Sequence, residues 1–294
     1  MKYFLSLCFA FALFQYSFGQ VPKVLIVNAH PDDESGVAVT VYKITQELGG
    51  IVDLAVITNG EAGYKYSILA EKIYGHPLTQ EAVGRKYLPK IRKKELRAGC
   101  NWVGIRDILY FDQLDTHYTL DADTVLTSVW SVEKIKQKLT KRIEKEGYDY
   151  IFCLLPTEET HGHHKAATIL ALETVKAYTG SNSPVILGVS GGMKTDTVQK
   201  TFYGLEKYPV TSLKNANQPA FQIDRTTPFG YKNKLNYKIV ANWLIAEHKS
   251  QGTMQTFMNQ GDYENFWYFD VNKPEKKAET QRFFEKLAKT SFVK

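Results

Sequence analysis

A buried strand that ends in a cluster of ionisable side chains is the feature that most constrains the fold of this chain. The apolar run Val24-Leu25-Ile26-Val27 is followed directly by Asn28-Ala29-His30-Pro31-Asp32-Asp33-Glu34. An imidazole and three carboxylates this close together are costly to bury unless a partner balances their charge. A divalent metal is the simplest partner, because histidine and aspartate suit zinc, which in catalytic sites holds three protein ligands and a water.

A second polar cluster stands in the same kind of context far downstream. The apolar run 150–155 ends at Pro156 and leads to Thr160-His161-Gly162-His163-His164, after which an apolar stretch from 166 to 175 is typical of a helix. Open parallel sheets bind ligands at the carboxyl ends of their strands, before the helices. Taken singly, the first cluster could be a turn with a capping aspartate and the second a solvated loop. Two such clusters at equivalent positions favour one shared metal site.

Apolar runs and amphipathic segments alternate through the first two thirds of the chain. We expect strands at 24–28, 52–58, 108–111, 150–155 and 184–189, with helices at 37–48, 91–103, 132–145 and 166–178. This alternation predicts an α/β, Rossmann-like three-layer fold with a mostly parallel sheet and helices on both faces. The strand order 3-2-1-4-5, which we infer from the fold class, would bring His30 and His164 into one crevice.

Two regions carry weaker patterns. Residues 64–88 are aromatic, polar and punctuated by Gly and Pro, which predicts a long surface excursion of the kind that often acts as a lid. Beyond residue 190 we expect strands at 201–205, 221–224 and 266–270 and helices at 235–248 and 276–288. We interpret 190–294 as an α+β extension packed on the core, so that 20–294 form one domain.

The first 19 residues have the pattern of a secretory signal peptide. Met1-Lys2 precedes an apolar stretch at 3–14, and Ser17-Phe18-Gly19 forms a small-residue cleavage site. We therefore expect an exported protein, periplasmic or secreted. The apolar stretch is too short to span a membrane, and no second long run follows it, so no transmembrane anchor is predicted. Cys100 and Cys153 are interpreted as buried thiols rather than as a disulfide.

The charge pattern excludes one class of partner. The formal net charge is +6, but the basic residues at 90–97 and 134–145 are interleaved with glutamates, as on solvated helix faces. No stretch combines aromatic and basic residues as nucleic-acid-binding surfaces do, so we expect no nucleic acid partner. A nucleotide-binding protein is disfavoured as well, because no Gly-x-Gly-x-x-Gly follows the first strand.

Five segments of this chain, in this order and spacing, resemble the PIG-L/LmbE-like family of zinc-dependent de-N-acetylases that act on acetylated amino sugars. They are Ala29-His30-Pro31-Asp32-Asp33-Glu34, Thr58-Asn59-Gly60-Glu61, the Arg92-x-x-Glu95 helix, the segment from Pro156 to His161-x-x-His164, and a weaker His248-x-Ser250-Gln251 motif. The resemblance covers most of the chain after residue 19, and the first motif is the most specific.

The resemblance implies a metal site and two catalytic groups. His30, Asp33 and His164 would hold Zn²⁺ or another divalent metal, Asp32 would be the general base, and His161 would be the general acid or would stabilise the oxyanion. The residues support this division, since adjacent aspartates must point in different directions. His161 and His164, three positions apart at a helix start, share one face.

This chain departs from the family pattern at two positions. The family usually has aspartate immediately before its second histidine ligand, where this sequence has His163. Some members place a tyrosine two residues before the acid histidine, where this sequence has Glu159. Both changes bear on the environment of His161 and leave the metal ligands intact.

The remaining candidates concern substrate and support. By resemblance Arg92 faces the substrate, with a surface ion pair to Glu95 as the alternative. Glu61 is a candidate for binding sugar hydroxyls, with plain solvation of its loop as the alternative. Glu34 and His163 are expected to support the metal ligands from behind, since metal-bound imidazoles usually donate their other N–H to a neighbour.

The resemblance implies a metal-dependent hydrolase that removes an N-acyl group, acetyl above all, from an amino sugar. Its substrate would be a small molecule or glycan that carries an N-acetylated amino sugar. Two alternatives stay open: an amidase acting on a larger amide conjugate, and a non-catalytic carbohydrate-binding protein on the same fold. The intact pair Asp32 and His161 argues against the second, because a binder needs neither a base nor an acid.

Overall fold

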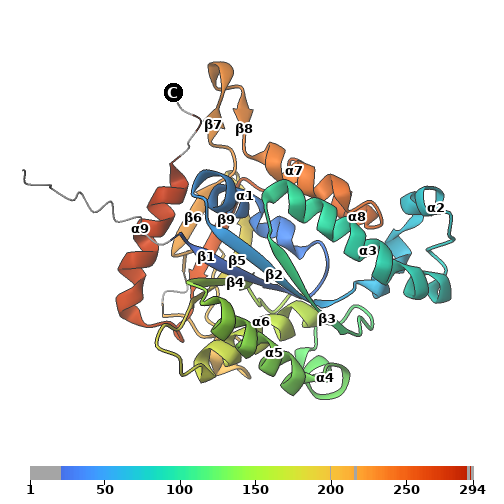
Figure 1. Ribbon diagram of the computed structural model, residues 1–294, viewed down its shortest axis with the longest axis horizontal. Coiled ribbons are helices and arrows are strands. Elements are labelled where there is room, and N and C mark those ends of the chain that lie inside the picture. Colours follow the sequence, from blue (N-terminus) through green and yellow to red (C-terminus); the bar gives the residue numbers. More distant parts are fainter. Residues whose placement is uncertain (1–20, 199, 215–216, 290–291, 293–294) are drawn as a thin grey trace, which may run out of the picture.

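The computed structural model describes residues 21–198, 200–214, 217–289 and 292, so the predicted signal peptide lies outside the described residues. Seven strands form one sheet in the order β3-β2-β1-β4-β5-β9-β6 (Figure 1). They are β1 (Lys23–Asn28), β2 (Ile51–Thr58), β3 (Asp107–Gln113), β4 (Tyr150–Leu154), β5 (Val185–Gly192), β6 (Phe221–Asp224) and β9 (Tyr263–Tyr268). The pairings from β3 to β5 are parallel, and β9 runs antiparallel to both β5 and β6. The α/β fold and the expected order of the first five strands are confirmed.

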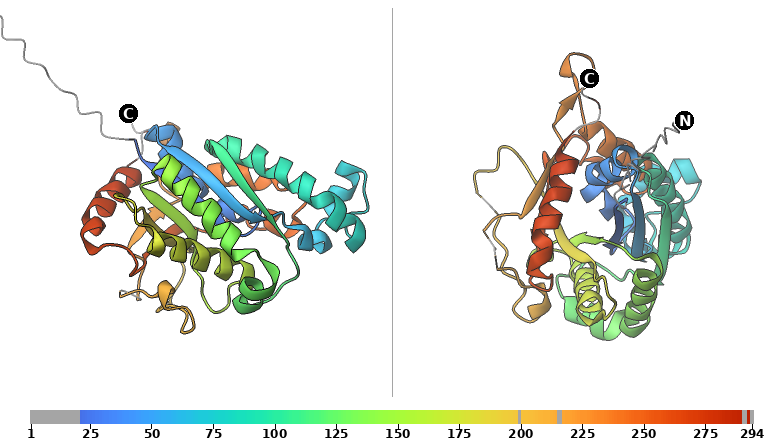
Figure 2. Two further views of the ribbon diagram at one scale, coloured as in Figure 1. Left: turned by 60° about the horizontal axis from the view of Figure 1, so that its bottom comes forward. Right: turned by 60° about the vertical axis from the view of Figure 1, so that its left-hand side comes forward.

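Helices cover both faces of this sheet (Figures 1 and 2). One face carries α1 (Ala38–Tyr42), α3 (Glu81–Val103), α7 (Lys238–Glu247) and α9 (Lys277–Ala288), and the other carries α4 (Ala122–Thr124), α5 (Val132–Glu146) and α6 (Gly162–Ala177). Successive residues of a strand point to opposite faces. Accordingly, Val24 and Ile26 of β1 belong to the first core, whereas Leu25 and Val27 belong to the second. The continuous apolar run 24–27 therefore contributes to the cores on both faces of the sheet.

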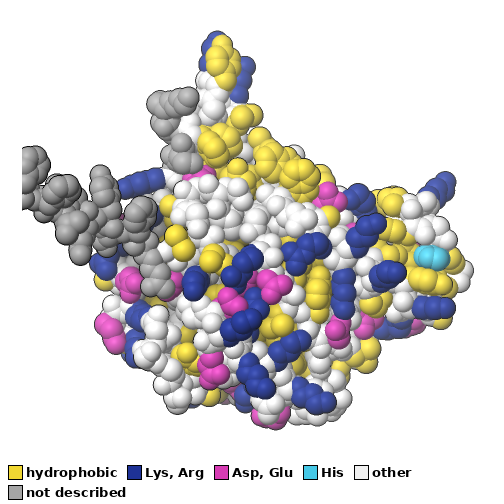
Figure 3. Space-filling view, viewed as in Figure 1, with side chains coloured by type: hydrophobic (Ala, Val, Ile, Leu, Met, Phe, Trp, Pro, Cys, Tyr) yellow, Lys and Arg dark blue, Asp and Glu magenta, His cyan; other side chains and the backbone are white. Residues whose placement is uncertain are grey.

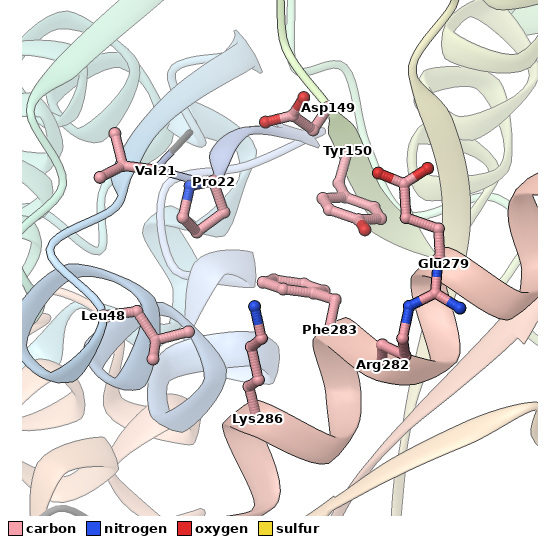
Figure 4. Close-up of a pocket in the computed structure, with 9 residues that line it drawn as sticks. All are labelled: Val21, Pro22, Leu48, Asp149, Tyr150, Glu279, Arg282, Phe283 and Lys286. Carbon is pink, nitrogen blue, oxygen red and sulfur yellow. The ribbon is translucent and has the colours of Figure 1, made fainter. Parts of the chain in front are cut away.

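The segment after residue 190 completes the same sheet. β9 and β6 extend it beyond β5, and Phe284 of α9 stacks on Phe221 with ring centroids 4.7 Å apart. At the amino ends of β1 and β4, Phe283 and Tyr150 lie beside a hollow of about 390 Å³ that α9 closes on one side (Figure 4). This hollow is at the opposite ends of the strands from the two histidine clusters.

Residues 64–88 lie largely at the surface, as predicted, but they are helical and not an irregular loop. They contain α2 (Ile68–Tyr74) and the start of α3, which begins at Glu81 and runs through Pro89. Pro89 lacks the N–H for one helical hydrogen bond, but the rest of the helix tolerates that loss because it is packed. Ala70, Leu78 and Leu88 form a small separate core that holds this unit together.

Three other local expectations differ in detail. Residues 37–48 form the short α1 followed by a π-helical turn (Lys43–Glu47) instead of one regular helix. The strand expected at 201–205 is absent from the described residues there. The segment is a loop, from which Phe202 and Leu205 bury their side chains. The helix expected at 235–248 begins only at Lys238, as α7. Its first expected residues form β8 (Leu235–Asn236), which pairs with β7 (Pro228–Phe229).

The surface and the thiols agree with the composition argument. Cys100 and Cys153 are buried and free, as predicted. On the face shown in Figure 3, basic and acidic side chains are interspersed. Across the part of the chain that the structure describes, no helix combines the length and apolar character needed to cross a membrane.

Candidate functional site

The two polar clusters meet at the carboxyl ends of β1 and β4, which are neighbours in the sheet. His30 Nδ1 lies 2.9 Å from His164 Nε2, and Asp33 Oδ1 lies 3.1 Å from the same nitrogen. One ligand atom from each of these three residues lies within 4.8 Å of the others. A zinc ion bonds such atoms at about 2.0–2.2 Å, so separations of this size fit three ligands around one ion. The donor set expected from the sequence is thus brought together.

The loop after β1 orients the Asp33 carboxylate. Its Oδ2 accepts the backbone N–H groups of Ala29 at 3.1 Å and His30 at 2.8 Å, which leaves Oδ1 directed at His164. Burial opposes the charged form, but the charges of His164 and His30 outweigh it and hold the pKa of Asp33 well below its usual range. The Asp33 carboxylate is therefore anionic across the physiological range.

Asp32 has a strained backbone and an altered pKa. Its φ of 143° lies in a region that residues other than glycine rarely adopt, and such strain concentrates at functional sites. Its N–H donates to Glu34 Oε2 at 2.9 Å. Burial and the neighbouring Asp33 raise the pKa of Asp32 to about 7, against the lowering influence of His248 and Arg92. A carboxylate with this pKa suits proton transfer near neutrality.

His161 caps the amino end of α6, where its Nδ1 accepts the N–H of His163 at 3.0 Å. Its ring centroid lies 5.3 Å from that of His30 and 5.5 Å from that of His164. Burial and the three neighbouring imidazoles lower the pKa of His161 to about 3. Since Nδ1 is engaged by the backbone, Nε2 is the nitrogen left for a substrate.

His163 lies behind His30, fully buried, and contacts a carboxylate that the sequence argument missed. Its Nδ1 is 3.1 Å from His30 Nε2 and 3.2 Å from Oδ1 of Asp115. Burial alone would raise the pKa of Asp115, but His163 and His30 hold it far below its usual range. Asp115 follows the end of β3, so the rule that located the other two clusters would have found it too.

A second group of donors competes with the first. His30, His161 and His163 also present nitrogens within ligand reach of one another. Of these, His161 Nδ1 already accepts a backbone N–H, and His163 Nδ1 faces Asp115. The set with Asp33 fits a metal better, because it includes an anionic ligand.

Arg92 and Glu61 lie beside this centre, and each has one buried polar atom without a hydrogen-bond partner among the described residues. Arg92 is buried, and among the described residues its Nε finds no hydrogen-bond partner. Gly60 and Gly63 make room for it, because a Cβ at either position would overlap the guanidinium nitrogens. Glu61 accepts the N–H of Asp115 with Oε1 at 3.2 Å, while its Oε2 is buried without a partner in the described part of the chain. Such groups need an explanation, and a polar ligand supplies one.

The His248-x-Ser250-Gln251 segment contacts the loop after β1 and the helix α3, and so holds both in place. His248 Nε2 lies 2.6 Å from Glu34 Oε1, and both side chains are fully buried. Ser250 donates to Glu95 through its N–H at 2.9 Å and its hydroxyl at 2.6 Å, and Gln251 donates to the carbonyl of Pro31. Glu95 is therefore an anchor for this segment, and the alternative of a surface ion pair with Arg92 is wrong.

Two imidazoles and one carboxylate at the switch point of an open α/β sheet form the arrangement of a catalytic metal centre. A family model described as PIG-L, GlcNAc-PI de-N-acetylase, matches residues 25–175, which is just over half of the chain. The chain belongs to this PIG-L family of deacetylases, as its motifs predicted.

Individual relatives agree with this assignment. The chain is 26% identical over 167 residues to a probable N-acetyl-α-D-glucosaminyl L-malate deacetylase 2 of Bacillus cereus, which covers 57% of this chain and 67% of the relative. An N,N′-diacetylchitobiose deacetylase from Pyrococcus horikoshii shares the fold with a TM-score of 0.54 at 20% identity, over 86% of this chain and 85% of that one.

A structural neighbour with a different chemistry limits what the fold alone implies. The 4-carboxy-2-hydroxymuconate hydratase from Pseudomonas putida KT2440 has a TM-score of 0.53 at 12% identity, over 86% of this chain and 97% of its own. One fold therefore carries unlike reactions, and the reaction has to be argued from the site residues.

Proposed function

We propose that this protein is a zinc-dependent hydrolase that removes an N-acyl group, acetyl included, from an amino sugar or glycoconjugate. The observation that carries the proposal is the donor set His30, Asp33 and His164 with Asp32 beside it. Membership of a deacetylase family and the acetylated sugars named for its relatives support the substrate class. Another divalent metal could occupy the same ligands.

The side chains divide the work of hydrolysis. A divalent ion in this site supplies Lewis acidity, which acidifies water and polarises a carbonyl oxygen. Asp32 takes a proton from the attacking water at its carboxylate. His161, with Nε2–H directed at the substrate, stabilises the oxyanion and hydrogen-bonds to the leaving amine, which receives the proton that Asp32 took from water. Asp115 and His163 hold the His30 ring from behind.

Arg92 and Glu61 would bind the sugar. Their unpartnered atoms match hydroxyl groups, which both donate and accept hydrogen bonds. Export to the periplasm or beyond is also part of the proposal and rests on the pattern of residues 1–19. Fractionation of cells expressing the full chain, followed by mass measurement of its amino terminus, tests it.

The function is tested by acetate release from N-acetylglucosamine and N,N′-diacetylchitobiose with the zinc-loaded protein. Asp32→Asn should keep the metal and lower kcat by about 10²–10⁴-fold, as expected for loss of a general base. Asp33→Asn, the matched control, should lower the zinc content itself. If Asp32→Asn loses zinc and Asp33→Asn keeps it, the two roles must be exchanged. No acetate release from either sugar by fully loaded protein would refute acetyl removal.

A further inference from the structure

An apolar cavity of about 560 Å³ opens beside the donor set, on the side of Asp32 and Asp33. Its lining includes His164 at the metal end and, beyond it, Leu154, Met193, Ile245, Met254 and Phe257. Ligand sites for small molecules have volumes of about 300–1,000 Å³, so the cavity is of functional size. It has room for far more than the methyl group of an acetyl substituent.

Two long polar side chains that line this cavity, Arg225 and Gln260, are already engaged within the protein. Arg225 donates through Nε to Glu264 at 3.0 Å and through Nη2 to the carbonyl of Ser35 at 2.8 Å. Gln260 donates to the carbonyl of Thr256 at 2.6 Å. A sugar ring needs free donors and acceptors to replace its water, and burying its hydroxyls without them is costly. The cavity therefore suits an apolar group better than a sugar.

The groups assigned to the sugar lie elsewhere. Arg92, Glu61 and His161 do not line the cavity, whereas Asp32 does. His161 serves the leaving amine in the proposed reaction, so the amine and its sugar lie toward His161. The other substituent of the scissile amide, the acyl chain, is then the part directed toward Asp32 and the cavity.

The wall of the cavity is built in advance. Met254 belongs to α8 (Gly252–Gln255), and Phe257 follows in a turn in which its N–H donates to the carbonyl of Met254 at 3.0 Å. Gln255 ties this segment to the end of α7 by donating to the carbonyls of Ile245 at 2.9 Å and His248 at 3.0 Å. Because this apolar wall is already ordered, binding an acyl chain does not add the entropy cost of ordering the wall.

We propose that this cavity receives an N-acyl chain of several carbons, so that the preferred substrates carry an acyl group longer than acetyl. This inference rests on the proposed hydrolase function. The reaction breaks the amide C–N bond, leaves the water oxygen on the acyl carbon as a carboxylic acid, and transfers a proton to the amine.

The test is a series of glucosamines that carry N-acetyl, N-butanoyl, N-hexanoyl or N-octanoyl groups. Each buried methylene should raise kcat/KM by about three- to fourfold, so burying the four added methylenes of the hexanoyl compound should raise kcat/KM by roughly 80- to 250-fold over the acetyl compound. Phe257→Glu should flatten the series by placing a charge in the wall. Tyr231→Glu, at a highly exposed aromatic residue outside the cavity, should leave the series as it is.

Calorimetric binding to the Asp32→Asn variant separates this inference from the function on which it rests. The octanoyl sugar should bind more tightly than the acetyl sugar, and Phe257→Glu should abolish the difference. Equal binding and a flat kinetic series would overturn the acyl cavity and leave acetyl removal standing. Chain-length-dependent binding without hydrolysis would overturn the hydrolase and keep the cavity. Preference for an octyl glycoside of N-acetylglucosamine over the octanoyl amide would place an aglycone there and overturn the acyl assignment.

Discussion

Replacing Glu34 by alanine tests whether the buried contact with His248 holds the catalytic loop in place. Glu34 accepts from His248 Nε2 at 2.6 Å and from the N–H of Asp32 at 2.9 Å, and both Glu34 and His248 are fully buried. Hydrogen bonds to charged groups contribute about 1.5–3 kcal/mol each. Removing one partner of a buried ion pair costs about 3–5 kcal/mol. The two arguments agree, so Glu34→Ala should lower the free energy of unfolding by about 3–5 kcal/mol, out of the roughly 5–15 kcal/mol typical of a protein.

The assay is urea unfolding of the metal-free protein followed by tryptophan fluorescence, since bound metal would add its own stabilisation. Glu34→Gln keeps an acceptor for the Asp32 N–H, so its free energy of unfolding should fall by less than that of Glu34→Ala. Burial lowers the pKa of His248, but Glu34 outweighs it and raises that pKa above its usual value. The stabilisation is then fully present below the unfolded pKa of about 6.5 and is lost as pH rises through the folded value.

The difference in free energy of unfolding between wild type and Glu34→Gln should accordingly become smaller as the pH rises. Glu133→Ala, at an exposed position on α5, is the control and should barely change the midpoint. An unfolding free energy of Glu34→Ala within about 1 kcal/mol of wild type would refute the reasoning, because that is less than one charged hydrogen bond.

Three further changes test the site. Although burial lowers the pKa of His30, its carboxylate neighbours raise it to about 9, so zinc binding at pH 7 should displace a proton and tighten as pH rises toward 9. Calorimetry in buffers of different ionisation enthalpy measures this, and zero proton release contradicts it. His163→Asp should raise the lowered pKa of His161 by adding a negative charge, which moves the alkaline limb of the pH–rate profile upward; an unchanged limb means that the protonation of His161 does not set it. Gly63→Ala should raise KM by displacing the Arg92 guanidinium, and Arg92→Ala should do the same, while zinc content measured by mass spectrometry stays constant.

The sequence predicted the parts of this fold that depend on short-range pattern. The apolar runs at β1 and β4 are long and unbroken, and they carry the polar clusters at the ends where a parallel sheet binds ligands. The relation between His30 and His164 followed from that rule together with the strand order. His248, by contrast, was only a weak candidate, because its contact with Glu34 spans 214 positions and no local spacing reports such a pairing.

The misses have physical causes of the same kind. The Gly and Pro residues of 64–88 favoured an irregular excursion, yet α3 begins at Glu81 and continues through Pro89, with Leu88 and Ile91 buried on either side of it. Phe202 and Leu205 suggested a strand because apolar spacing reports burial, and a loop can bury side chains as well. Asp115 belongs to no recognised motif, although its position after the end of β3 follows the same rule as the two clusters after β1 and β4.

The contact between His248 and Glu34 has a consequence for the order in which the site forms during synthesis. All three proposed metal ligands lie between residues 30 and 164, inside the segment that matches the family, whereas His248 lies well beyond it. At about 5–20 residues per second, the ribosome exposes the ligands several seconds before His248 emerges. In that interval the Glu34 carboxylate has no imidazole to face, and the strained turn at Asp32 lacks its support. We therefore expect the loop that carries Asp32 to reach its final geometry only when the stretch around His248 has been synthesised and packs against it.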